Sequence, residues 1–342
     1  MARVPTSKDV ARIAGVSQST VSYVMSGKRP ISARTRRLVE DAMQQLTYQP
    51  HAGARALASQ RTNVIGLVVP FRSEVNAHGL MAFVEEIALS ARAHDHDILM
   101  VTADEGTAGL QRLAGRSLCD ALVMMEISTH DVRVPVVRAL GVPALLIGLP
   151  GDTTGLHCVD FDFETGATLL VDEVADLGHE RACVLAWPAG FAGGDMNYVP
   201  RFRGAAEATA RRRGVELSWR EVPRGRENVD HVLEEVLGGG GTPPGLVCTS
   251  QLSGIVSGLQ RRGLRTGADV DLLALTTDAE AEAEEVPVSG VSTQPRDVSR
   301  RAMRTLFQLL DGVPPQGAVE LVPAELTRRS SSRRPPQDAA AG

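Results

Sequence analysis

A run of polar side chains near the N-terminus carries the first recognisable chemistry. On the outward face of a short amphipathic segment, after a glycine-containing turn, stand Gln18, Ser19, Ser22 and Tyr23. Glutamine can form two hydrogen bonds with adenine, serine can bond several base edges, and tyrosine offers a hydroxyl and a ring for a thymine methyl group. These residue types at this spacing suit the reading of base edges in a DNA groove.

Three short helices are predicted to position these side chains. Apolar residues recurring at i, i+3 and i+4 predict helices over residues 7–14, 18–25 and 33–46. Gly15 ends the first helix, whose start Thr6 or Ser7 can cap, and Ser17 and Ser32 can cap the other two. Helix, tight turn and second helix is the order of a helix-turn-helix, although periodicity alone also fits a plain three-helix bundle with a polar face.

The charge distribution separates this segment from the rest of the chain. Residues 1–62 hold ten basic and three acidic side chains, a net charge of +7, within a chain of net charge −5. The remaining residues therefore carry −12. A basic module on an acidic body indicates an anionic partner for the N-terminal module, with nucleic acid the first candidate.

The bulk composition restricts the class of protein. A chain of 342 residues with 43% hydrophobic and 23% charged side chains predicts two or three globular domains. No apolar run approaches the ~18 residues of a membrane span, and no signal-peptide core is present, which predicts a cytoplasmic protein. The four cysteines lie far apart in apolar runs and predict buried, reduced thiols rather than zinc ligands.

Beyond residue 62 the pattern changes to alternating strands and helices. Buried strands are predicted over residues 64–69, 98–102, 121–125, 144–147, 182–187, 217–222, 246–248 and 272–275. Helices are predicted over residues 80–93, 132–140, 163–177, 202–213, 229–237 and 252–262. Two such arrays predict two doubly wound α/β lobes that bind ligands at the carboxyl ends of their strands.

The N-terminal run resembles a known family of regulators. The stretch from Lys8 to Val24 is similar to the headpiece of the lactose-repressor (LacI/GalR) family, and residues 32–35, 48–50 and 54–57 continue the match in register. The likeness extends to about Ala324. It implies an all-α helix-turn-helix headpiece followed by a periplasmic-binding-protein-like (type I) sensor of two α/β lobes.

The resemblance implies a role for individual headpiece residues. Gln18, Ser19 and Tyr23 occupy its base-reading positions, and side chains that would bond phosphates without reading sequence are Ser17, Thr20, Ser26, Ser32 and Thr35. In the segment after the headpiece, Ala54 and Leu57 match the minor-groove hinge, where an apolar wedge bends the duplex.

The hinge departs from the family pattern at two positions. His51 stands where the family commonly has asparagine, and Gly53 where it has alanine or valine. Residues 51–61 are too few to hold a helix alone in water, and a glycine lowers helix propensity by up to ~1 kcal/mol. We therefore expect a helix that forms only on DNA.

Domain limits follow from these patterns. We expect a headpiece at 1–48, a hinge helix at 49–62, an effector-binding and dimerisation domain at 63–328, and a disordered tail at 329–342. Within the sensor the N-terminal lobe is expected at about 63–160 and 291–315, and the C-terminal lobe at about 161–290 and 316–328.

The resemblance also implies effector ligands in the cleft. Arg201, in an Arg-x-x-Gly motif, matches an arginine that bonds effector oxygens, and Asp278 matches a carboxylate that accepts effector hydroxyls. Phe71 and Trp187 follow strands and could stack a ring, and as lone aromatics they could equally be packing residues; Thr249 follows the strand at 246–248.

Two customary sugar partners are missing from the cleft. Thr249-Ser250 replaces a common Asn-Asp pair, and Ile147-Gly148-Leu149 replaces a common aspartate. Three alternatives stay open: a smaller effector, a less hydroxylated one, or none.

Two other classes of protein, enzymes and transport-type binding proteins, share some of these sequence features. The sequence contains no Gly-x-Ser-x-Gly elbow, Walker loop, or GxGxxG after a strand, so an enzyme is disfavoured. His94-Asp95-His96-Asp97 has metal-ligand residue types but stands at a helix-to-strand turn, where a solvated loop is the commoner reading. A transport-type binding protein shares the sensor fold but lacks the headpiece.

The sequence therefore predicts a DNA-binding transcription regulator without catalytic residues, metal or cofactor. We expect an effector-responsive repressor that binds a palindromic operator in double-stranded DNA as a homodimer. The expected effector is a small molecule, for example a sugar or related metabolite. DNA binding would place the protein at the nucleoid, with no membrane partner.

Overall fold

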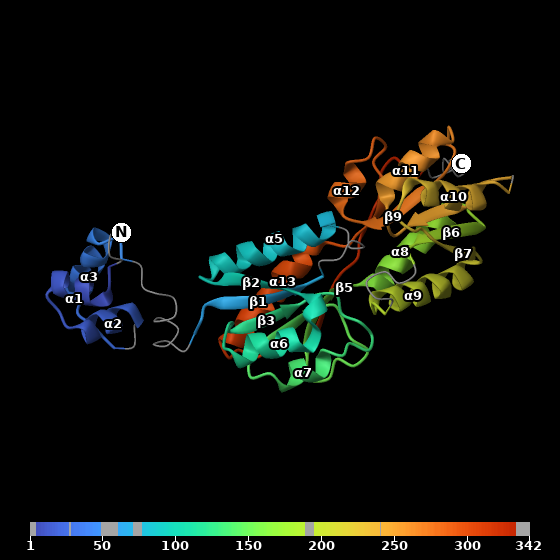
Figure 1. Cartoon of the computed structure of the whole chain (residues 1–342). Helices are drawn as coiled ribbons and strands as arrows, with labels where there is room; N and C mark the ends of the chain where they lie inside the picture. Colours follow the sequence, from blue (N-terminus) through green and yellow to red (C-terminus); the bar gives the residue numbers. More distant parts are fainter. Residues whose placement is uncertain are drawn as a thin grey trace, which may run out of the picture.

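The chain forms a small helical headpiece and a larger two-lobed α/β body (Figure 1). The computed structural model describes residues 5–26, 29–48, 61–70, 77–188, 195–239 and 241–332. Among the helices it describes, none combines the length and apolar character of a membrane span. Of the expected hinge only Thr62 and Arg61 lie inside the described residues.

The headpiece consists of the helices α1 (Ser7–Ala14), α2 (Gln18–Ser26) and α3 (Ala33–Gln45). Their buried side chains come from all three helices and are Val10, Ala11, Ala14, Val21, Val24, Val39 and Ala42. Ile13, which periodicity placed in the apolar stripe of α1, is 37% exposed. The three predicted helices are otherwise confirmed to within one or two residues.

The N-terminal lobe is built on six parallel strands in the order β11-β5-β4-β3-β1-β2. They are β1 (Val64–Val69), β2 (Asp97–Thr102), β3 (Ala121–Met124), β4 (Ala144–Ile147), β5 (His157–Phe161) and β11 (Val319–Val322). Its helices are α5 (Ala77–Ala93), α6 (Gly106–Gly115), α7 (Val134–Ala139) and α13 (Pro295–Leu310), with a 3-10 turn, η1, at Ala103–Glu105. Strands buried on both faces explain the continuous apolar runs in the sequence.

The C-terminal lobe repeats this plan with the strand order β12-β10-β9-β8-β6-β7. The strands are β6 (Arg181–Ala186), β7 (Glu216–Glu221), β8 (Gly245–Cys248), β9 (Leu272–Thr276), β10 (Ser289–Ser292) and β12 (Leu326–Thr327), and only β12 among them pairs antiparallel. The helices are α8 (Phe163–Asp176), α9 (Tyr198–Arg213), α10 (Arg226–Leu237), α11 (Leu252–Arg261) and α12 (Asp278–Glu282). The predicted two-lobe α/β class is confirmed.

The chain passes between the lobes after β5, after β10 and after β11. The expectation that residues 316–328 belong to the C-terminal lobe is therefore wrong for β11, which pairs with β5 in the N-terminal sheet. Residues 291–292 likewise belong to β10 of the C-terminal sheet. These strands of four residues are too short to give a clear periodicity in the sequence, and pairing with a neighbouring strand defines them.

The last described residues form a clasp on the C-terminal lobe, which we call the C-terminal clasp (residues 326–332). Ser331 is fully buried: its hydroxyl donates to the Leu272 carbonyl (2.6 Å) and accepts from the Ser289 amide (2.7 Å). A Cβ on Gly267, whose φ is +76°, would lie 2.1 Å from the Ser330 carbonyl oxygen, so only glycine fits there. The expected disorder from residue 329 is wrong for 329–332, and 333–342 lie outside the described residues.

The clasp should contribute measurably to stability. Ser331→Ala leaves a buried carbonyl and a buried amide without that partner, and we expect a loss of about 1–3 kcal/mol of unfolding free energy. Ser330→Ala, at an exposed neighbour, is the matched control and should change it by less than about 0.5 kcal/mol. Urea unfolding measures both, and equal effects would contradict the assigned role.

Candidate DNA-binding surface and ligand cavity

The turn between α1 and α2 is fixed by local geometry. Gly15 caps α1 with a left-handed backbone (φ 65°), which an L side chain rarely adopts. At the start of α1 the Asp9 carboxylate accepts from the Thr6 amide (3.0 Å) and hydroxyl (2.7 Å). These contacts fix both ends of α1. The backbone conformation of Gly15 then determines the direction in which the chain continues into α2.

The predicted base-reading side chains lie together on α2. Gln18 and Ser19 are exposed, and Tyr23, one turn further, is half-buried. The Gln18 side-chain amide donates to the Ser7 hydroxyl (2.9 Å), and the Arg29 guanidinium lies 4.9 Å from the centre of the Tyr23 ring. The structure thus presents these three groups on one helix, with two of them already oriented by neighbours.

The predicted phosphate contacts fall into two similar pairs. Ser17 and Ser32 begin α2 and α3, where their hydroxyls accept from the amides of Thr20 (3.1 Å) and Thr35 (3.2 Å). In each pair the two hydroxyl oxygens are 2.8 Å apart. A helix N-terminus favours an anion through its free amides and its dipole, so each pair marks a place where a phosphate can bind.

Several predicted site residues cannot be placed. Ala54, Leu57 and Phe71 lie outside the described residues, and so does the side chain of Ser26. Their predicted roles in phosphate, minor-groove and effector contacts stay predictions.

The body meets the hinge at a carboxylate that sequence reasoning missed. Asp120, just before β3, accepts from the Thr62 amide (2.7 Å), the Thr62 hydroxyl (2.8 Å) and the Asn63 amide (2.8 Å). We call this set the Asp120 anchor. It lies 57 residues along the chain from Asn63, so no local pattern could have revealed it.

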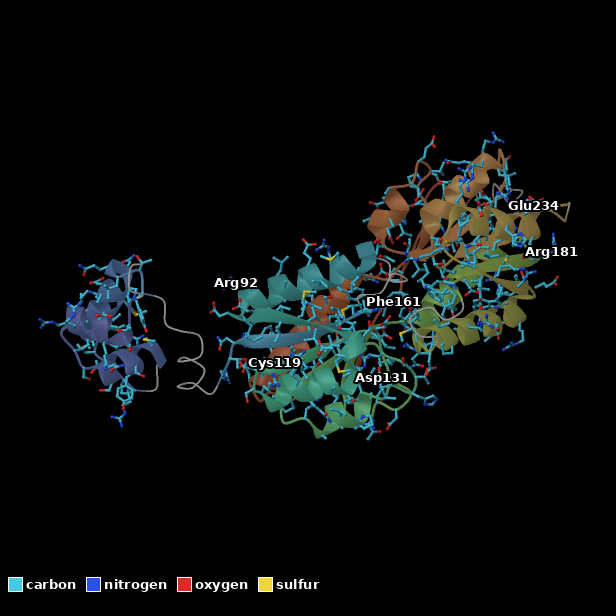
Figure 2. The ribbon with its side chains drawn as sticks, viewed as in Figure 1. Arg92, Cys119, Asp131, Phe161, Arg181 and Glu234 are labelled. Carbon is cyan, nitrogen blue, oxygen red and sulfur yellow. The ribbon has the colours of Figure 1, made fainter. Side chains whose placement is uncertain are left out.

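A cavity of about 900 Å³ lies where the carboxyl ends of the strands of both lobes meet. Its apolar lining includes Leu80, Phe83, Met125, Ile147 and Phe161 from the N-terminal lobe and Phe163, Trp187, Tyr198 and Leu275 from the C-terminal lobe. Figure 2 shows Phe161 where the two lobes meet. The predicted ligand residues Trp187 and Thr249 both line the cavity.

The rings on the C-terminal side contact one another. Phe163 stacks on Tyr198 with ring centres 4.8 Å apart, and Trp187 meets Tyr198 edge to face at 5.4 Å. Phe161 meets Phe163 edge to face at 5.1 Å. Trp187 therefore lines the cavity and is also part of a packed cluster; its stacking on an effector ring stays a prediction.

Arg201 is engaged by the protein's own carboxylates. Its NH1 donates to Asp160 (2.6 Å), while Nε and NH2 form a two-pronged contact with Glu164 (2.7 and 2.6 Å). Asp160 is the penultimate residue of β5 in the N-terminal lobe and lines the cavity, whereas Arg201 lies on α9 and is not a lining residue. The ion pair connects the lobes, and the structure presents Asp160, not Arg201, to a ligand.

Asp278 lies apart from the cavity, contrary to the sequence-based expectation. It is the first residue of α12, its side chain is 53% exposed, and it pairs with Arg329 at 2.6 Å. The lining residues at this strand end are instead Thr276, Thr277 and Glu280. Thr277 and Glu280 cap α12 reciprocally, which turns them toward the cavity and leaves Asp278 on the outer side.

A second set of contacts joins the lobes beside the cavity. Ser128 and Met196 form an antiparallel bridge, the Thr129 amide donates to the Asp195 carbonyl (2.8 Å), and the Asn197 amide group donates to the Leu149 carbonyl (2.8 Å). We call this set the interlobe latch. These hydrogen bonds would have to break for the lobes to separate on this side.

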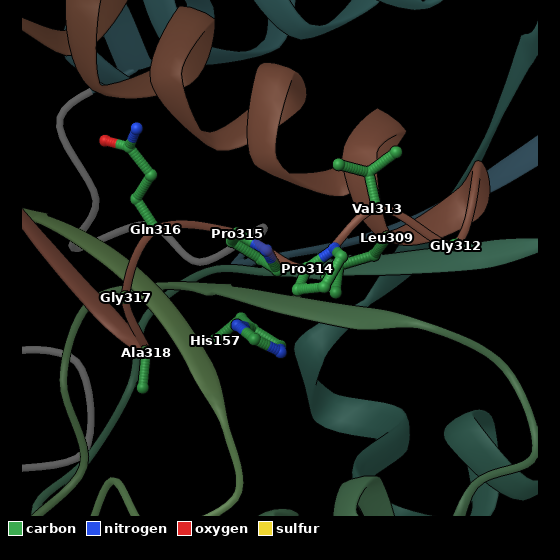
Figure 3. Close-up of a pocket in the computed structure, with 9 residues that line it drawn as sticks. All are labelled: His157, Leu309, Gly312, Val313, Pro314, Pro315, Gln316, Gly317 and Ala318. Atoms are coloured by element: carbon green, nitrogen blue, oxygen red, sulfur yellow. The ribbon is translucent and has the colours of Figure 1, made fainter.

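A smaller cavity of about 530 Å³ lies at the other end of β5 (Figure 3). His157, Leu309 and residues 312–318 line it. The Nδ1 atom of His157 is buried and has no hydrogen-bond partner among the described residues. The cavity contains none of the predicted site residues.

The described residues offer no group of three or more candidate metal ligands. The His94–Asp97 turn is used structurally, because the His94 ring stacks on Phe307 at 3.8 Å and His96 Nδ1 lies 2.7 Å from the His94 carbonyl oxygen. All four cysteines are free and buried, and burial raises the pKa of Cys119 to about 11.

Two family models match this chain. Residues 6–51 match the model of bacterial regulatory proteins of the lacI family, and residues 171–332 match a periplasmic binding protein-like domain. The first covers the headpiece helices and the second most of the C-terminal lobe.

Curated relatives match over most of the chain. Catabolite control protein A of Priestia megaterium is 24% identical over 95% of this chain and 98% of its own length. The lactose operon repressor of Escherichia coli (strain K12) is 25% identical over 96% and 90%. The transcriptional regulator CelR of Thermobifida fusca is 28% identical over 89% and 91%.

Solved structures share the fold. The lac repressor dimer bound to operator and the anti-inducer ONPF superposes with a TM-score of 0.81 at 22% identity, covering 96% of this chain and 99% of that one. A complex of the regulator CelR with cellobiose gives a TM-score of 0.63 at 22% identity, covering 96% of this chain and 100% of that one.

The position of Tyr23 predicts a loss of base discrimination on mutation. Tyr23→Ala should weaken binding to the preferred DNA sequence by about 1–3 kcal/mol and leave non-specific binding nearly unchanged. Tyr23→Phe removes only the hydroxyl and separates its contribution from that of the ring. Fluorescence anisotropy with specific and scrambled duplexes measures both, and a parallel fall in the two affinities would show that Tyr23 is a packing residue.

Asp160 predicts a distinct pH dependence of stability. Burial raises the pKa of Asp160 to about 6, although Arg201 opposes the shift. A carboxyl with a raised folded-state pKa favours folding at low pH and loses that contribution as pH rises from about 4 to 6. Asp160→Asn has no carboxyl to ionise, so its unfolding free energy relative to wild type should rise over this range, by about 1–3 kcal/mol.

Urea unfolding at pH 4 to 7 tests this, with Asp152→Asn as the matched control. Hydrogen bonds from Thr154 and Arg138 lower the pKa of Asp152 to about 2, so its stability contribution changes only below about pH 4 and this variant should run nearly parallel to wild type from pH 4 to 7. A flat profile for Asp160→Asn would contradict the assigned environment.

Proposed function

The chain belongs to the LacI family of bacterial regulatory proteins and is a DNA-binding transcription regulator, and from this premise we propose that it is a homodimeric repressor controlled by a ligand in the interlobe cavity. The observation that carries the proposal is the headpiece, where the side chains predicted to read bases lie on α2 and those predicted to bind phosphates lie at the N-termini of α2 and α3. The cavity supplies the place for the effector.

Operator recognition would divide between two kinds of contact. Gln18, Ser19 and Tyr23 would read base edges in the major groove, and the Ser17–Thr20 and Ser32–Thr35 pairs would hold phosphates and fix the register. One recognition helix covers only a few base pairs. A homodimer on a near-palindromic operator doubles the contact, because two-fold protein symmetry matches two-fold DNA symmetry.

The effector would act on the hinge through the N-terminal lobe. The segment 49–62 continues into β1, and the Asp120 anchor ties its end to β3. We infer that the two hinges of a dimer order together on the operator and insert Leu57 into the minor groove. A small rotation of the lobes would separate the two hinges or bring them together. Effector binding and operator binding would then be coupled by a free energy of about 1–3 kcal/mol.

Relatives support small-molecule control. The CelR structure contains cellobiose, and the lac repressor structure contains ONPF. For this chain we propose an organic effector of the size of the cavity, acting either as inducer or as co-repressor. We also propose that its place of action is the nucleoid in the cytoplasm, where the operator is.

DNA footprinting should show two protected half-sites related by a two-fold axis, and affinity should fall steeply with salt. Each phosphate neutralised adds about −0.9 to the slope of log K against log salt. Protein lacking residues 1–62 is the control and should lose DNA retention while keeping the folded body. A single half-site bound by monomer, or a flat salt response, would contradict the proposal. An enzyme or a transport protein would give neither result.

A further inference from the structure

The charge at the interlobe ion pair is negative. Arg201 contributes one positive charge, and Asp160 and Glu164 contribute two negative charges within 2.7 Å of it. The family resemblance predicts an arginine that binds effector oxygens at this position. Here that guanidinium is neutralised before any ligand arrives, and the member of the pair that lines the cavity is Asp160, whose carboxylate accepts from Arg201 (2.6 Å) and from the Phe161 amide (2.9 Å).

The rest of the described lining has the same sign. Besides Asp160, its charged side chains are two carboxylates, Glu126 and Glu280, and one guanidinium, Arg224. An anionic ligand would lose its hydration and meet an excess of like charge. A cationic ligand would meet opposite charge without displacing any of the contacts that hold Arg201.

Aromatic rings adjoin these carboxylates. Phe161 directly follows Asp160 in the sequence, and the buried phenol of Tyr198 lies close enough to Glu126 and Asp160 for their charges to raise its pKa, after the larger effect of burial. The ring contacts of Tyr198 with Phe163 and Trp187 make a wall of π-faces and edges. Such faces attract organic cations, and the attraction is strongest where water is excluded.

We propose that the cavity accepts an organic cation: an amine whose ammonium group lies on the Asp160–Glu126 side and whose apolar part lies against the ring wall of Phe161, Phe163, Trp187 and Tyr198. This inference names the class of effector for the proposed regulation and rests on that proposed function. It also accounts for the missing sugar-hydroxyl partners at Ile147–Leu149 and Thr249–Ser250, where the described cavity is apolar or carries only hydroxyls.

A series of three probes with one ring and different charge tests the proposal. Isothermal titration of the full chain at pH 7.5 with phenethylamine, 2-phenylethanol and phenylacetate should give the tightest binding for the amine, by at least about tenfold over the alcohol, and the weakest for the acid. Equal affinities, the reverse order, or no binding of the amine at millimolar concentration would overturn it.

Charge-neutral variants locate the site. Asp160→Asn and Glu126→Gln should each reduce the preference for amine over alcohol by at least about tenfold. Glu216→Gln removes an equal charge at the opposite end of a C-lobe strand and should leave the preference unchanged. Thermal unfolding of each variant confirms folding, and Glu126→Gln, outside the ion pair with Arg201, tests the site if Asp160→Asn does not fold. An unchanged preference in both folded variants would overturn the assignment.

The same titrations with operator DNA present separate this inference from the proposed function. If the amine binds but operator affinity does not change, the ligand class holds and the proposed regulation fails. If the alcohol binds best and still changes operator affinity, regulation holds and the cationic class fails.

Discussion

The structure depends on one geometric constraint: in two sheets of mostly parallel strands, these strands deliver their carboxyl ends to a single cavity. The side chains at those ends come from residues far apart in sequence, and each lobe supplies only part of the lining. The chain must also cross between the lobes at the same place, after β5, β10 and β11. Ligand binding and relative movement of the lobes therefore involve the same residues.

Three kinds of contact hold the lobes together, and they differ in strength and selectivity. The ring cluster buries apolar surface, the interlobe latch consists of hydrogen bonds to backbone carbonyls, and the Asp160–Arg201 pair is charged and mostly desolvated. Removing one partner of such a pair leaves an uncompensated charge, whereas a protein can keep the intact pair at little net cost. The Asp160–Arg201 ion pair also contributes to ligand selectivity, because its charges favour some ligands near Asp160 and disfavour others.

Local signals predicted the fold well, and non-local contacts explain the errors. Helix caps such as Ser17 and Ser32, and the apolar strands, can be read over a few residues. The strand β11 is only four residues long and is defined by its pairing with β5, and the buried Ser331 lies in a Ser/Arg/Pro-rich stretch whose composition concealed its contact with Leu272. The prediction for Asp278 was wrong because the reciprocal cap of α12 turns Thr277 and Glu280 toward the cavity and leaves Asp278 on the outer side. The role of Arg201 as an effector ligand stays a prediction, because its partners Glu164 and Asp160, 37 and 41 residues away, occupy the guanidinium and it does not line the cavity.

The Asp120 anchor has a mechanical consequence. Three hydrogen bonds from two successive residues fix both the position and the heading of the chain as it leaves the sheet. If the chain were flexible where it leaves the sheet, changes in a few backbone dihedral angles would absorb a tilt of the lobe before it reached the headpiece. With the exit clamped, the lobe acts as a lever: its angular displacement reaches Thr62 undiminished, and the resulting offset grows with the distance from the pivot.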